Sequence, residues 1–299
     1  MTTLTAELEA FIAELHRRKV RPNTITAYTS DLRLVARQLQ GSLDRLTLAD
    51  IEVVLESESL APTTIARRTA SLKRFFTWAT KQGLCPTNPL TNREPMRSSI
   101  RRLPRPIQST TDLAAIDRAI AQAPLPYRLI FTIVRETGMR IGEVLALQRA
   151  DVCLEPGREG LRVRAPKNGH ERMAVLGAKA TPRSLRGLRA LIKDLHDQGC
   201  YVPLFRSNRG TAVSYAAAQY QWTHLCQAIC LIDVVAGKQQ LRYTIHQLRH
   251  TRGSELIRAG QPMEIVQRVL GHRDIRSTQG YAELDDLQVR EALEYGPLR

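Results

Sequence analysis

The sequence lacks any long hydrophobic run. Its longest apolar stretch, around Leu129–Val134, is far shorter than the ~18–20 residues that cross a bilayer, and Arg128 and Arg135 bound it. The N-terminal segment carries glutamates and has neither the basic start nor the apolar core of a secretory signal. We therefore expect a cytoplasmic protein, neither membrane-spanning nor secreted.

Cysteine is scarce as well, and the sequence contains no internal repeat. In a chain that is not secreted, the five cysteines are predicted to be reduced thiols rather than a disulfide framework. Cys226 and Cys230 with His224 have only weak metal-ligand spacing, so buried structural cysteines are the favoured interpretation. No acidic cluster lies near the histidines of the C-terminal third, which disfavours a metal-dependent nuclease.

Positive charge is present in large excess. The 299 residues include 44 Lys+Arg against 29 Asp+Glu, a formal net charge of +15. Such a balance indicates an anionic partner, either nucleic acid or an anionic membrane surface. The hydrophobic content of 43% is ordinary for a folded protein, and the length predicts two domains at ~100–200 residues each.

Residues 1–92 show helical periodicity and form the first predicted domain. Apolar side chains recur at helical spacing in residues 4–15, 25–39, 48–55 and 62–81. On the last of these helices, Arg67, Arg68, Lys73 and Arg74 interleave with the apolar residues. Two interpretations stay open for them: a solvated basic face on a packed helix, or a surface for DNA phosphates.

Residues 93–108 combine prolines and arginines without apolar periodicity, which predicts an extended linker. Its arginines, among them Arg101, Arg102 and Arg105, are further candidates for phosphate contacts. Residues 109–299 form the second predicted domain, with helices expected near 111–121, 126–136, 140–146, 185–196, 215–229, 247–259, 263–270 and 277–284. Residues 161–176 predict a β-hairpin that turns at Asn168-Gly169, with Val163, Met173 and Val175 on one apolar face. The expected fold class is mainly α with a small antiparallel β-sheet (α+β).

The second domain concentrates polar residues that suit phosphate chemistry. His246 and Arg249 are three residues apart and share one face of a helix; His272 follows a helix stop, and Tyr281 comes nine residues later. Upstream, Arg140 follows a glycine turn and Lys167 lies in the hairpin turn. Each residue alone is more often a solvated or packing residue. The ordered combination of Arg, Lys, His-x-x-Arg, Gly-His and Tyr indicates a site.

These segments resemble the tyrosine recombinases, also called the phage integrase family. The matching segments are TGMRIGEVLAL (137–147), the hairpin LRVRAPKNGHERMAVL (161–176), HQLRHT (246–251), LGH (270–272) and STQGYAEL (277–284). The helical N-terminal region with its Asn88-Pro89-Leu90 exit is similar to the family's core-binding domain, and the length is similar to the Xer type. The resemblance implies an all-helical core-binding domain and a catalytic domain that form a clamp around DNA.

The resemblance also implies the reaction and the role of each residue. A site-specific recombinase cuts and rejoins DNA through a 3′-phosphotyrosyl intermediate and a Holliday junction, in integration, excision, resolution or transposition. Arg140 and Arg249 would clamp the scissile phosphate, because arginines offer paired donors and stay charged. Tyr281 would be the nucleophile and Lys167 the general acid. His246 would transfer protons on the tyrosine side, and His272 would donate a hydrogen bond to the phosphate.

Glu143, one helical turn beyond Arg140, is open to two interpretations: it orients the arginine, or it is a plain surface acid. His170 and His250 are interpreted as structural or solvated. Arg252-Gly253 and Gly280 depart from the residue types usual in the family, without removing a catalytic group.

No cofactor or metal is expected, since the arginines supply the positive charge. The expected partner is a double-stranded DNA recombination site, with four protomers on two sites, alone or with a related recombinase or accessory protein. The C-terminal segment 285–299 would either dock on a neighbouring subunit or be a solvated terminus. Two alternatives remain: strand relaxation of the type IB topoisomerase kind, and a non-catalytic DNA-binding protein on the same fold.

Overall fold

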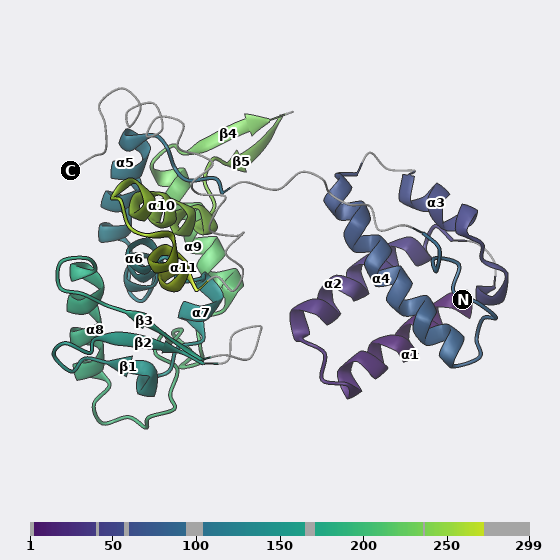
Figure 1. Ribbon diagram of the computed structural model, residues 1–299, viewed down its shortest axis with the longest axis horizontal. Coiled ribbons are helices and arrows are strands. Elements are labelled where there is room, and N and C mark those ends of the chain that lie inside the picture. Colours follow the sequence, from purple (N-terminus) through teal and green to yellow (C-terminus); the bar gives the residue numbers. More distant parts are fainter. Residues whose placement is uncertain are drawn as a thin grey trace. The chain divides into compact units, whose positions relative to one another are not determined.

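The computed structural model describes residues 3–39, 42–56, 60–93, 104–164, 171–235 and 237–271. The chain divides into two compact units, Met1–Arg101 and Arg102–Arg299 (Figure 1). Each unit has a hydrophobic core of its own. Within the described residues, no helix is both long and apolar enough to span a membrane.

The first unit is built from helices. They are α1 (Thr3–Arg17), α2 (Pro22–Ala36), the 3₁₀ turn η1 (Leu43–Arg45), α3 (Leu48–Glu56) and α4 (Pro62–Lys81). Proline at the first position of α2 and of α4 starts each helix, because its missing N–H is one that a helix start leaves unbonded. The apolar stripes of α1, α2 and α4 meet in one core, where Phe11 and Phe75 pack edge to face with ring centres 5.5 Å apart. The four helices expected from the periodicity are confirmed.

The second unit packs its helices around α6. Its elements are α5 (Thr110–Gln122), α6 (Tyr127–Thr137), α7 (Ile141–Leu145), the 3₁₀ turn η2 (Arg149–Asp151), β1 (Val152–Cys153), β2 (Gly160–Val163), β3 (Arg172–Val175), α8 (Pro182–Asp194), α9 (Tyr215–Ala228), β4 (Ile232–Val235), β5 (Lys238–Leu241), α10 (Ile245–Arg258) and α11 (Met263–Leu270). Helices α5, α8 and α10 pack against α6, whose middle residues are almost completely buried. Trp222 of α9 lies edge to face on Phe131 of α6, with ring centres 5.3 Å apart. The mainly helical α+β class is confirmed.

Strands β1, β2 and β3 form one antiparallel sheet in that order. Because Val163 pairs with Arg172 and Leu161 with Ala174, these four residues share one face of the sheet. Val163 is buried, whereas Met173 and Val175 are 46% and 72% exposed. The expectation of one apolar face for Val163, Met173 and Val175 is therefore wrong, since the pairing register places the last two on the solvent side.

A second hairpin, β4–β5, was not expected from the sequence. Its signal is the β-branched residues Ile232, Val234 and Val235, followed by Gly237, whose φ of +74° suits a tight turn. Two other expectations, the turn at Asn168-Gly169 and the helix at 277–284, lie outside the described residues.

The five cysteines are all unpaired. Cys226 is buried, which raises the pKa of its thiol to about 12, as expected for a structural cysteine. Cys230 is exposed, contrary to that expectation, because α9 ends at Ala228 and the chain turns there with φ of +57°.

Candidate active site

Arg140 is presented by a tight turn between α6 and α7. Helix α6 ends at Thr137, and Gly138 has φ of +70°, the left-handed region that favours glycine. A Cβ at Gly138 would lie 2.6 Å from Cδ2 of Leu270 in α11, so a side chain there would clash. Arg140 is the N-cap of α7, and its side chain is 46% exposed. The turn therefore leaves this guanidinium accessible to a ligand.

Glu143 holds Arg140 from the first turn of α7. Its Oε2 accepts the backbone N–H of Arg140 at 2.9 Å, and its Oε1 accepts Nη1 of the same residue at 3.0 Å. The Glu143 side chain is only 8% exposed. Burial disfavours the carboxylate, but the positive charges of Arg172 and Arg140 outweigh it and hold the pKa of Glu143 below its ordinary value. The orienting role is confirmed, and the interpretation of Glu143 as a plain surface acid is wrong.

Arg249 is buried against the same turn. Helix α10 begins where the Gln247 side chain accepts the backbone N–H of Thr244 at 2.8 Å, which places His246 and Arg249 on its first two turns. Arg249 is 2% exposed, and its Nη1 donates to the carbonyl oxygen of Gly138 at 2.7 Å. This bond spans 111 positions of sequence and ties Arg249 to a residue two positions before Arg140.

The imidazole rings of His246 and His250 are in contact on α10. They lie edge to face, with centres 4.6 Å apart. Desolvation and the positive charges of Arg249 and Arg140 lower the pKa of His246, so its imidazole is neutral at neutral pH and can accept a proton. Desolvation, His246 and Arg249 lower the pKa of His250 to about 4. His250 is partly buried, as expected for a structural histidine.

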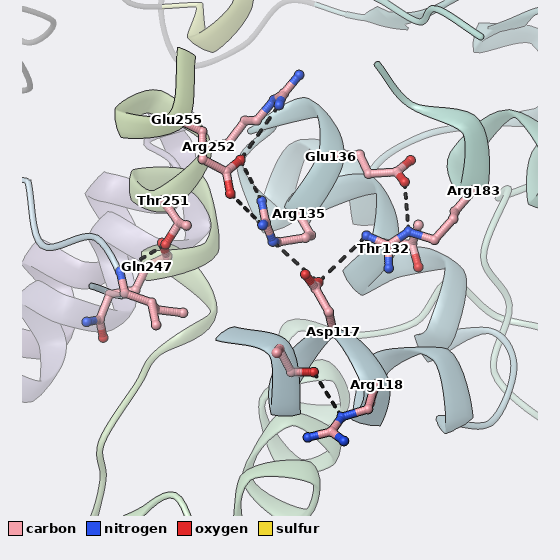
Figure 2. A network of polar contacts seen from close by, with 12 residues as sticks. Asp117, Arg118, Thr132, Arg135, Glu136, Arg183, Gln247, Thr251, Arg252 and Glu255 are labelled. Carbon is pink, nitrogen blue, oxygen red and sulfur yellow. Dashed lines mark hydrogen bonds and ion pairs between the residues drawn. The ribbon is translucent and has the colours of Figure 1, made fainter. Parts of the chain in front are cut away.

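A polar network joins α10 to α6 (Figure 2). Both terminal nitrogens of Arg135 donate to Glu255, at 2.8 and 2.5 Å, and Asp117 of α5 lies 3.4 Å from Nε of Arg135. Arg183 of α8 lies 3.6 Å from Asp117, and Arg252 lies 3.6 Å from Glu255. The network connects four helices, and it gives Arg252, one of the departures from the family pattern, a partner within α10.

Arg140, His246 and Arg249 are thus brought together by the α6–α7 turn and the start of α10. The other three expected catalytic residues, Lys167, His272 and Tyr281, lie outside the described residues, as do His170 and Gly280. The structure adds Arg172, whose Nη2 donates to Oε2 of Glu143 at 2.7 Å. The strand pattern could have indicated this residue. Arg172 and Ala174 are two positions apart on β3, so they share one face of the sheet, and Ala174 faces the core.

The first unit carries the other basic residues of interest on α4. Arg67 is half exposed, and its Nη1 donates at 2.7 Å to Asp31 of α2, a buried carboxylate. Burial raises the pKa of Asp31, against the opposing charges of Arg67 and Arg68. Arg68 is only 7% exposed. Packing encloses its side chain, so Arg68 offers little surface to a phosphate.

Lys73 and Arg74 are exposed on α4. Nζ of Lys73 lies 3.3 Å from the carbonyl oxygen of Thr91, and the guanidinium of Arg74 lies 5.7 Å from the centre of the Tyr28 ring. Both charges remain at the surface.

Of the three linker arginines, Arg101 and Arg102 lie outside the described residues, and Arg105 is exposed. Two residues beyond Arg105, Ile107 is buried in the second unit and donates its backbone N–H to Oγ1 of Thr251 at 2.9 Å. That bond anchors the chain beside Arg105.

Comparison with known proteins agrees with this geometry. The model of the phage integrase family matches residues 109–288. The chain belongs to the phage integrase family. A second model, the phage integrase N-terminal SAM-like domain, matches residues 8–83. The family resemblance drawn from the motifs is therefore confirmed, and it covers both units of this family member.

Curated relatives of this family member align over most of its length. Tyrosine recombinase XerD of Ralstonia nicotianae is 31% identical over 276 residues, covering 88% of this chain and 84% of that protein. Tyrosine recombinase XerC of Chromohalobacter salexigens is 28% identical over 301 residues, covering 97% and 94%.

Solved structures share the fold. A lambda integrase dimer bound to a COC′ core site superposes with a TM-score of 0.70 at 20% identity, over 94% of this chain and 95% of that one. XerH site-specific recombinase, in a post-cleavage complex with a palindromic difH substrate, gives a TM-score of 0.67 at 21% identity, over 91% and 79%.

Proposed function

We propose that this chain is a site-specific DNA recombinase that cuts and rejoins strands with Arg140, Lys167, His246, Arg249, His272 and Tyr281 as its catalytic residues. The observation that carries the proposal is the meeting of Arg140, at the start of α7, with His246 and Arg249 of α10 at one turn. Membership of the phage integrase family and about 30% identity to tyrosine recombinases support the same reaction.

The two arginines suit a phosphodiester that gains negative charge during attack. Arg249 is fixed by burial and by its bond to the carbonyl of Gly138, so its donors are preorganised. Arg140 is half exposed. Its Nη1 donates to Glu143, and the other guanidinium nitrogens take no part in that bond. One arginine fixed inside and one accessible arginine form a clamp for the non-bridging oxygens of a phosphate.

The proton transfers then follow from the other residues. The phenolic oxygen of Tyr281 attacks phosphorus, its proton passes to neutral His246, and a 3′-phosphotyrosyl bond forms. The bond from phosphorus to the 5′ oxygen breaks, and Lys167 supplies the proton that makes the 5′ hydroxyl a leaving group. His272 donates a hydrogen bond to the phosphate. Attack by a 5′ hydroxyl reverses these steps and rejoins the strand.

DNA binding is assigned to both units. Arg67, Lys73 and Arg74 on α4, together with Arg101, Arg102 and Arg105, are proposed to contact phosphates, within a helical core-binding domain (1–92), a linker (93–108) and a catalytic domain (109–299). We further propose that the two domains clamp duplex DNA and that four protomers assemble on two sites in the cytoplasm, alone or with a related recombinase. A lambda integrase tetramer bound to a Holliday junction, with a TM-score of 0.67 and 20% identity, is an example of such an assembly on this fold.

Covalent capture of DNA tests the proposal. The full-length protein is incubated with a library of duplexes of random sequence, each nicked near its centre so that a cleaved strand cannot be rejoined. Adducts that resist SDS are recovered and sequenced. We expect adducts with one enriched sequence from the wild type and from Tyr201→Phe, a matched change at an exposed tyrosine. We expect none from Tyr281→Phe, which should still bind the enriched duplex.

Three outcomes separate the alternatives. Binding without an adduct from the wild type would leave a non-catalytic DNA-binding protein. Relaxation of supercoiled plasmids that lack the enriched sequence would favour the topoisomerase alternative. Adduct formation by Tyr281→Phe would show that another residue is the nucleophile.

A further inference from the structure

The guanidinium of Arg172 lies at the junction of three elements of the second unit. Arg172 is the first residue of β3 and shares the inner face of the sheet with Val163 and Ala174. Its side chain is 16% exposed, and Nη2 donates to Glu143 Oε2 at 2.7 Å. Nε and Nη1 are buried and have no hydrogen-bond partner among the described residues. An arginine held in this way stays at its position because Glu143 balances its charge.

Gly271, at the end of α11, packs on the same guanidinium. Its φ is +65°, and a Cβ built there would lie 2.3 Å from Nε and 2.6 Å from Cζ of Arg172. Only a residue without a side chain allows the guanidinium to occupy this place. Arg172 is therefore enclosed by the α11 C-terminus on one side and by Glu143 of α7 on the other.

The Glu143 carboxylate accepts hydrogen bonds from both Arg140 and Arg172. Oε2 accepts both the Arg172 guanidinium and the backbone N–H of Arg140, and Oε1 accepts the Arg140 side chain. Rotation of the carboxylate would break the two hydrogen bonds to Oε2, so these bonds favour the orientation in which Oε1 accepts the Arg140 guanidinium. Burial raises the pKa of this carboxyl, and among the opposing effects that hold it below its ordinary value the positive charge of Arg172 is the largest.

We propose that Arg172 is a positioning residue for Arg140: through the Glu143 carboxylate it fixes the direction of the guanidinium that binds the scissile phosphate. The inference rests on the proposed function, because it requires Arg140 to act on the scissile phosphate. Arg172 itself does not touch the reacting atoms. It also links the hairpin that carries Lys167 to the turn that carries Arg140, since β3 begins at Arg172 and α7 holds Glu143.

Single-turnover cleavage of the nicked duplex by full-length protein, at saturating protein, tests this role. We expect Arg172→Met to lower the cleavage rate constant about 10- to 100-fold, the loss typical of a misdirected catalytic group, while DNA affinity stays within about twofold. Arg172→Lys keeps the positive charge but lacks the planar guanidinium with its several donors, so its cleavage rate constant should lie between those of the wild type and Arg172→Met. The matched control is Arg162→Met on the solvent face of β2, where we expect a wild-type rate.

A double variant distinguishes positioning from simple stabilisation of the fold. Arg140→Met/Arg172→Met should cleave at the rate of Arg140→Met alone, because Arg172 has nothing left to position. If Arg172→Met slows the Arg140→Met protein by the same factor as the wild type, or if Arg172→Met cleaves at the wild-type rate, the proposal is wrong.

A measurement without DNA keeps the inference independent of catalysis. Carbon-13 NMR of the Glu143 carboxyl should show a higher pKa in Arg172→Met than in the wild type, and an unchanged pKa would overturn the inference. Arg172→Gln, which also removes the charge, provides the same readout if Arg172→Met does not fold. If the wild type forms no adduct with any duplex, the proposed function fails, and the NMR result still decides whether Arg172 holds Glu143.

Discussion

The charge network of Arg135, Glu255 and Asp117 yields a prediction about stability: Glu255→Gln destabilises the second unit. The substitution keeps the shape of the side chain and removes the charge that Arg135 faces. Arg135 is 9% exposed, and both of its terminal nitrogens donate to Glu255. Burial of Arg135 opposes its charge, yet Glu255 and Asp117 raise its pKa above the ordinary value. Without Glu255, the carboxylate of Asp117, at 3.4 Å, is the one acidic partner that the described residues leave to the buried Arg135.

The size of the effect follows from the exposure of the pair. Exposed ion pairs contribute about 0–1 kcal/mol, and removal of one partner from a buried pair costs about 3–5 kcal/mol. Because Glu255 is 31% exposed and Asp117 remains, we expect the free energy of unfolding of the second unit to fall by about 2 kcal/mol. For a unit of this size, that loss corresponds to roughly 4–8 °C in Tm.

The two tryptophans of the chain allow each unit to be followed separately. Trp78 belongs to the core of the first unit, and Trp222 is completely buried in the second. In a Trp78→Phe background, urea unfolding of the full chain followed by tryptophan fluorescence reports on the second unit alone. Glu155→Gln is the matched control, since Glu155 is 71% exposed and lies 3.9 Å from Arg158, which is 82% exposed. We expect a change within about 0.5 kcal/mol for this control.

Equal stability losses for Glu255→Gln and Glu155→Gln would refute the reasoning, because the Arg135–Glu255 pair would then behave as a surface pair. A second check is the variant Arg135→Met/Glu255→Leu, which replaces both charges by apolar groups. It should recover most of the stability that Glu255→Gln loses.

Two further predictions concern pH and salt. The pKa of His250 is about 4 in the folded protein, below its ordinary value of 6.5. Between these two pH values the unfolded chain binds a proton that the folded protein does not. The stability that neutral His250 contributes is therefore complete above pH 6.5 and is lost as the pH falls toward 4. At pH 5 this lowers the free energy of unfolding by at most about 2 kcal/mol. Urea unfolding midpoints measured at pH 7.5 and pH 5 should show this loss in the wild type and not in His250→Gln. Lys73→Gln and Arg74→Gln should each lower the slope of log affinity for duplex DNA against log salt by about 0.9. Arg68→Gln should leave that slope unchanged and lower stability, because Arg68 is buried.

Much of the fold could be predicted from the sequence, because the signals for it are local. Apolar periodicity placed every helix of the first unit and nearly all of the second, and proline and glycine marked several of their ends. The order of the motifs along the chain was enough to indicate the family, and the comparisons confirmed it. The excess positive charge indicated an anionic partner, because net charge depends on composition alone.

Contacts between distant residues were decided only by the tertiary structure. The bond from Arg249 to Gly138 spans 111 positions, and that from Arg172 to Glu143 spans 29. Whether a basic side chain is buried, as Arg68 is, depends on which helix packs against it. The exposed face of β3 depends on the strand register, which a single residue of slip would reverse. The sequence by itself determined which chemistry is present; the packing of α6, α7, β3 and α10 decided which of its charges meet.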